Sequence, residues 1–167
     1  IVSAVCEVIP NVAGFLSIDV KDAVMATGAL ALGPLAGVLI SLVVALLEFI
    51  TVSDTGVYGL IMNFLSSMTF TLVASLIYRF RRSLSGAVLA LVSAALATTS
   101  VMMLANLLIT PFYMGVTRGA VIDLIPRLLF PFNLTKSTLN AAVVLLLYKP
   151  LTGALVRAGL MRGLGGR

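Results

Sequence analysis

The chain has 167 residues, of which 60% are hydrophobic and only 10% are charged, and its mean hydropathy is +1.18. Soluble domains are about half apolar and about a quarter charged, so this composition excludes an ordinary soluble protein. The net charge of +5 does not indicate nucleic-acid binding, because the basic residues are concentrated in a short loop and at the C-terminal end. We therefore expect an all-α membrane protein that forms a single domain over residues 1–167.

The inventory of reactive side chains is small. The chain has no histidine, which removes the commonest general base and metal ligand, and its one cysteine, Cys6, excludes an internal disulfide. Neither a Ser-His-Asp set, an HExxH helix, a GxSxG turn nor a phosphate-binding Walker loop is present in the sequence. We predict that the protein is not an enzyme and needs no cofactor or metal, and that any ATP it depends on is hydrolysed by another subunit.

Six apolar segments follow one another along the chain. The first is too short to span a bilayer, which takes roughly 20 residues, so we interpret it as the end of a first helix that begins outside this sequence. Turn-forming residues separate the others: a loop from Pro10 to Asp22, the pair Gly33-Pro34, and a polar turn at 53–56. The prediction is a compact bundle of six transmembrane helices, with apolar segments at 1–9, 23–32, 35–50, 57–78, 84–109 and 139–156, and with a long connection at 111–131.

Charge sets the expected orientation. Arg79, Arg81 and Arg82 form the densest basic loop, and the C-terminal end is basic from Lys149 onward. Because positive loops stay in the cytoplasm, both should lie inside, which the two intervening spans allow. If 23–50 reverses at Gly33-Pro34, both termini are cytoplasmic and all six acidic residues lie on the outer side.

The remaining polar residues gather near the outer ends of the predicted helices. Asn133 and Lys136 are three residues apart at the start of the last helix, and Asn140 extends the same face by one turn. By the topology, Asn106 and Glu48 lie at the same depth. Amide groups and one cation suit a flat organic ligand with carbonyls and ring nitrogens. The alternative is that Lys136 reaches the headgroups and the asparagines cap helices.

Aromatic and small residues each allow two interpretations. Phe112, Tyr113, Phe130 and Phe132 flank the polar residues, either to stack on a ring or to form an interfacial aromatic belt. Small residues crowd 26–37 and 93–100, either to pack helices closely or to dock a second membrane subunit.

Four segments resemble one known family: GALALGPLAGVLISL, SDTGVYGLIMNF, ANLLITPFYMG and PFNLTKSTLNAAVVLLLYKPL. Their order and spacing are similar to those of the substrate-binding S components of energy-coupling factor (ECF) vitamin transporters, and most of all to the riboflavin-binding members. The resemblance runs from about Val8 to Leu155.

The resemblance implies a six-helix protein in the plasma membrane of a prokaryote that binds one vitamin near its outer face. It implies partnership with a transmembrane coupling protein (EcfT-like) and two cytoplasmic ATPases. In riboflavin-binding members, the residues matching Asn106, Asn133 and Lys136 contact the flavin. The loop after the first helix helps close the site, which adds Leu16 to the candidate set. The predicted substrate-binding residues are Asn106, Asn133, Lys136, Tyr113, Phe132, Glu48, Leu16 and Asn140.

Departures from the family pattern leave two alternatives. The first loop, PNVAGFLSIDVKD, has few prolines and aromatic residues, and Glu48 stands where an acid is not expected. The ligand is therefore riboflavin or another vitamin or precursor. A membrane scaffold subunit with no transport role is the other alternative, in which the polar cluster would only cap helices.

Overall fold

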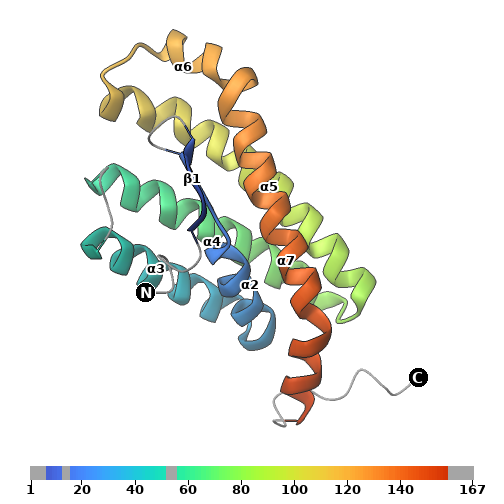
Figure 1. Cartoon of the computed structure of the whole chain (residues 1–167). Coiled ribbons are helices and arrows are strands. Elements are labelled where there is room, and N and C mark those ends of the chain that lie inside the picture. Colours follow the sequence, from blue (N-terminus) through green and yellow to red (C-terminus); the bar gives the residue numbers. More distant parts are fainter. Residues whose placement is uncertain (1–6, 13–15, 52–55, 158–167) are drawn as a thin grey trace.

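The computed structural model describes residues 7–12, 16–51 and 56–157 (Figure 1). A short hairpin comes first, and helices make up the rest. In chain order the elements are β1 (Glu7–Val12), β2 (Leu16–Asp19), α2 (Lys21–Leu32), α3 (Pro34–Thr51), α4 (Gly56–Phe80), α5 (Leu84–Met114), α6 (Arg118–Leu124), the π-helical segment η1 (Ile125–Leu129) and α7 (Phe130–Arg157).

Four helical stretches of the described chain are long and apolar enough to cross a membrane. They are Pro34–Thr51, Gly56–Phe80, Leu84–Met114 and Arg118–Pro150. Large apolar side chains on them, such as Ile50, Leu104 and Leu146, are exposed, as expected of surfaces that face lipid. A helical membrane protein is therefore confirmed, whereas the count of six spans and the sidedness of the termini stay predictions.

Helix α2 is the short member of the bundle, with 12 residues, and it ends where the sequence predicted a reversal. Gly33 has φ +100°, a conformation that favours glycine, and Pro34 opens α3. A Cβ added to Gly37 would lie 2.7 Å from the Ala29 Cβ, so α3 folds back against α2. The break at Gly33-Pro34 is confirmed as a tight helical hairpin.

The core is built from small side chains between long helices. Helix α4 packs between α3 and α5, α5 also packs on α7, and α2 lies among α3, α4 and α7. Ala74, Ala90 and Ala94 are fully buried, with Phe70 and Leu91 between them. The crowding of small residues at 26–37 and 93–100 is thus used, at least in part, for close helix packing.

Aromatic contacts mark the two ends of the bundle. At one end, the hydroxyl groups of Tyr78 and Tyr148 are 3.0 Å apart and join α4 to α7. At the other end, the Tyr58 and Tyr113 ring centroids are 6.4 Å apart and join the start of α4 to the end of α5. We call these the Tyr78 end and the Tyr113 end.

Residues 7–12 and 16–19 differ from the prediction. Residues 7–9 were expected to end a helix and 10–22 to form a loop, but Glu7–Val12 pairs with Leu16–Asp19 as an antiparallel hairpin. Strand β2 contacts α7, and Figure 1 shows the hairpin crossing the bundle between α3 and α7. A short apolar run in the sequence does not distinguish a helix from a strand. Here the pairing of Glu7–Val12 with a second strand makes it a strand. The predicted helical residues 1–6 lie outside the described part.

The segment 111–131, predicted as a long connection between two helices, is instead mostly helical. Helix α5 continues to Met114, and α6, η1 and α7 follow with a break only around Gly115, which has φ +65°. Pro126 lies at the start of η1 and Pro131 lies near the start of α7. Because proline lacks a backbone N–H donor, these two prolines favoured the prediction of a loop. In the structure both lie in or next to the wider π-helical segment, where the helical hydrogen-bond pattern changes.

Candidate functional site

The polar face of α7 points into the bundle. Asn133 and Lys136 are 6% and 9% exposed, and Asn140 is fully buried, whereas Thr135 and Thr138 beside them are exposed. Helical spacing of three and four residues produces this division. Lys136 is packed inside rather than extended to the surface, which disfavours the headgroup alternative. A buried lysine in a membrane protein usually marks a functional site.

Asn106, Asn133 and Asn140, all buried, share one local geometry. In each, Nδ2 donates to the carbonyl oxygen four residues earlier: Asn106 to Met102 at 2.7 Å, Asn133 to Leu129 at 2.8 Å, and Asn140 to Lys136 at 3.0 Å. An amide can make about four hydrogen bonds, so this bond leaves each Oδ1 directed forward as an acceptor. Asn106 and Asn140 differ in the group that donates to this Oδ1.

Asn106 and Asn133 keep their amide bonds within their own helices. The Oδ1 of Asn106 accepts from the Thr110 hydroxyl at 3.0 Å, one turn further along α5. Asn133 follows η1 directly, and its bond to Leu129 occupies a carbonyl at the end of that segment. Helices α5 and α7 pack on each other, and each of the two asparagines is buried in the half of its helix nearer the Tyr113 end.

Asn140 instead joins two helices. Its Oδ1 accepts from the backbone N–H of Ala23 at 2.7 Å, although the two residues are 117 positions apart. Ala23 is the third residue of α2, and Val20, at the N-cap, makes no side-chain capping bond. Asn140 therefore supplies the cap that the local sequence lacks.

Glu48 forms a buried ion pair with Lys21. The Nζ of Lys21 donates to its two carboxylate oxygens at 2.6 and 2.8 Å, and both side chains are buried. Next to Lys21, buried Asp22 accepts from the hydroxyl of Ser67 in α4. The first turn of α2 is thus bonded to α3, α4 and α7 at once.

The predicted aromatic residues take separate positions. Tyr113 is half-buried and lies against Tyr58 at the Tyr113 end. Phe132 packs on a cluster around Val121 and Leu129, which seals α6 and η1 onto α7. Phe112 and Phe130 are exposed, which supports the aromatic-belt interpretation for these two.

Leu16 begins β2 and pairs with Val12 across the hairpin, and its side chain lies outside the described residues. The backbone of β2 nevertheless contacts α7, the helix that carries Asn133 and Lys136. Whether the hairpin closes a site there, as the resemblance implies for the loop after the first helix, stays a prediction.

Sequence reasoning missed Lys21, Asp22 and Ser67. Lys21 and Asp22 were assigned to the outer loop, yet they form the buried first turn of α2. A signal existed: Glu48 ends an apolar stretch, and an acid there requires a basic partner. Lys21 is the basic residue nearest to it in sequence.

Comparison with known proteins gives the family. The profile described as "ECF transporter, substrate-specific component" matches residues 1–151. This chain belongs to the S components of ECF transporters. The chain is 30% identical over 155 residues to the riboflavin transporter RibU of Staphylococcus aureus (strain TCH60), covering 89% of this chain and 82% of that protein.

A solved structure agrees with the fold of this S component. It is reported as "Structure and mechanism of the S component of a bacterial ECF transporter" and superposes with a TM-score of 0.74 at 28% identity. The match covers 88% of this chain and 84% of that chain. The S component is therefore a transport protein of the membrane, as the four resembling segments predicted.

Proposed function

We propose that this S component binds riboflavin with high affinity and delivers it for uptake. The observation that carries the proposal is the buried polar face of α7, where Asn133 and Lys136 lie inside a membrane bundle, on the helix that β2 contacts. The similarity to a riboflavin transporter over most of the chain supports the choice of ligand.

The chemistry of the site fits the polar edge of a flavin. Lys136 supplies a cation and up to three donors for a carbonyl oxygen, and Asn133 and Asn106 supply amide donors and acceptors for carbonyls and ring nitrogens. Tyr113, Phe132 and Leu16 would bound the apolar ring system, as is usual for pockets of small organic ligands.

Two of the predicted residues act on the ligand indirectly in this proposal. Glu48 is held by Lys21, and the Oδ1 of Asn140 is held by Ala23. Both bonds fix the first turn of α2 to neighbouring helices. Only Val20 separates this turn from the end of strand β2. We assign Glu48 and Asn140 to positioning of the hairpin against α7 rather than to direct contact.

The transport cycle follows from the family. Both termini would lie in the cytoplasm, in the plasma membrane of a prokaryote, with riboflavin entering from the outer face. A transmembrane coupling protein and two cytoplasmic ATPases would supply the energy, since the sequence carries no phosphate-binding loop of its own.

Titration of the purified protein with riboflavin tests the proposal. Quenching of flavin fluorescence reports binding, and the absence of tryptophan simplifies the ultraviolet spectrum. Asn133→Ala and Lys136→Ala should each cost about 1–3 kcal/mol, which is about 5- to 150-fold in Kd, because a ligand group loses its partner in a buried site. Thr135→Ala is the matched control, since Thr135 lies between them but is exposed.

The result also separates the alternatives. Mass spectrometry of small molecules extracted from the purified protein identifies another vitamin or precursor directly. No quenching by riboflavin, or equal affinity in wild type and Lys136→Ala, would refute the proposed ligand or its site.

A further inference from the structure

A cavity lies at the Tyr78 end of the bundle, away from the proposed vitamin site. Its volume is about 330 Å³, and it lies between the α2–α3 turn and the end of α4. The lining includes Gly33, Pro34, Ser75, Tyr78, Arg79 and Arg82. Tyr148, bonded to Tyr78, is 15 residues beyond Asn133 on α7, a separation of about 22 Å along a helix at 1.5 Å per residue.

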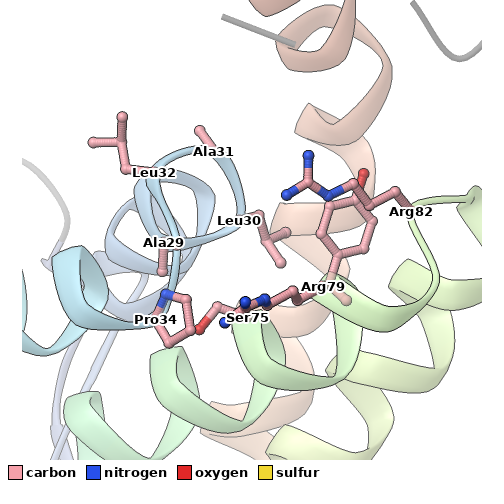
Figure 2. A pocket seen from close by; sticks show the side chains of 10 residues that line it. Ala29, Leu30, Ala31, Leu32, Pro34, Ser75, Arg79 and Arg82 are labelled. Carbon is pink, nitrogen blue, oxygen red and sulfur yellow. The ribbon is translucent and has the colours of Figure 1, made fainter. Parts of the chain in front are cut away.

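Two arginines give the cavity its charge. Figure 2 shows the side chains of Arg79 and Arg82 extending from the end of α4 toward the α2–α3 turn. Within the described chain, neither arginine forms an ion pair with an acidic side chain. Asp22 and Glu48 are bonded at the first turn of α2, the opposite end of that helix from the cavity.

The polar groups deeper in the cavity are already used. The Ser75 hydroxyl donates to the Thr71 carbonyl at 2.6 Å, and Tyr78 is bonded to Tyr148. Recognition of a ligand therefore falls on the two guanidinium groups. Guanidinium groups bind phosphate oxygens in a planar, two-bond geometry, and two of them together suit a phosphate group.

The surroundings favour an amphipathic anion over a free one. Leu32, Leu35 and Phe80 are 64%, 74% and 88% exposed, and they lie within the α2–α3 turn or beside Arg79. Large apolar side chains exposed next to paired arginines fit acyl chains that continue from a phosphate headgroup. Basic pockets between transmembrane helices on the cytoplasmic side bind such headgroups.

We propose that this cavity binds the phosphate group of an anionic phospholipid of the inner leaflet. The lipid would fill the gap between the α2–α3 turn and α4 and hold these two elements together. The proposal rests on the membrane residence of the family and on the cytoplasmic side proposed above for the Arg79–Arg82 loop, and it is independent of which vitamin is bound.

Thermal unfolding of the detergent-purified protein tests this site. Phosphatidylglycerol should raise the Tm of the wild type, and phosphatidylcholine should not. The double variant Arg79→Gln/Arg82→Gln should need at least about tenfold more phosphatidylglycerol for the same shift, because both charge-assisted contacts are lost. Arg81→Gln is the matched control, since Arg81 belongs to the same loop but does not line the cavity.

Three outcomes would overturn the proposal. If phosphatidylglycerol raised the Tm of the double variant as much as that of the wild type, the cavity would not be the binding site. If Arg81→Gln weakened the Tm shift as much as the double variant does, the lipid would be responding to nonspecific surface charge. A shift produced equally by inorganic phosphate would replace the lipid by free phosphate. Circular dichroism and size-exclusion chromatography of the double variant establish that it is folded before the comparison.

Discussion

The side-chain oxygen of Asn140 caps helix α2 by accepting from the Ala23 backbone N–H at 2.7 Å, across 117 residues of sequence. This bond joins the helix that carries the candidate ligand residues to the helix that follows the hairpin. It ties the first turn of α2 to the polar face of α7, and the two helices also pack on each other.

Replacing Asn140 should therefore destabilise the fold. We expect Asn140→Ala to lower stability by about 0.5–2 kcal/mol, because the Ala23 N–H loses its shorter acceptor and keeps only the Val20 carbonyl oxygen at 3.1 Å. Thermal unfolding in detergent measures the change. Thr138→Ala, at an exposed position two residues earlier, should unfold close to the wild-type temperature. Equal melting temperatures for Asn140→Ala and wild type would show that the cap is dispensable.

The buried pair of Lys21 and Glu48 yields a prediction about coupling. Lys21→Met or Glu48→Leu alone should cost about 3–5 kcal/mol, since each leaves an unpaired charge in the bundle. The double variant Lys21→Met/Glu48→Leu should recover most of that loss, because neither partner of the pair is left as an unpaired buried charge. A double-mutant cycle of unfolding measures the coupling, and additive losses would contradict a direct ion pair.

Gly86 controls the turn between α4 and α5. A Cβ on this residue would overlap the carbonyl oxygen of Arg81, and backbone on both sides fixes the approach. Gly86→Ala should therefore lower the Tm markedly, even though alanine favours helices. Gly119→Ala in α6 is the control: its Cβ would meet only the Thr117 Oγ1 at 3.9 Å, so we expect no loss and a gain of up to about 1 kcal/mol. Similar melting temperatures for the two variants would argue against the tight turn.

Gly37 determines how closely α2 and α3 approach. An added Cβ would lie 2.7 Å from the Ala29 Cβ and 3.3 Å from the Thr71 Cβ, so Gly37→Ala should push α3 away from α2 and α4. Overpacking of this kind costs about 1–3 kcal/mol, to be measured by thermal unfolding. Gly28→Ala meets only the flexible end of Ile40, at 3.3 Å, and should be milder. A larger loss at Gly28 than at Gly37 would refute this packing.

The candidate site was predictable where its signal was local. The spacing of Asn133, Lys136 and Asn140 predicted one helix face, and the face is buried as expected. The different role of Asn140 was not predictable, because its partner is a backbone group of another helix. Glu48 stood out as an acid in an apolar stretch, but its bond to Lys21 spans 27 residues.

Hydropathy and turn-forming residues along the chain determined the membrane class, the long helices α3, α4 and α5, and the reversal at Gly33-Pro34. These features depend on neighbouring residues, since a helix satisfies its own backbone and lipid selects its apolar surface. Only the tertiary structure decided the pairing of Glu7–Val12 with Leu16–Asp19, the largely helical course of 111–131 and the partners of the buried polar groups. Buried polar atoms need partners, and those partners come from whichever elements the packing brings within bonding distance.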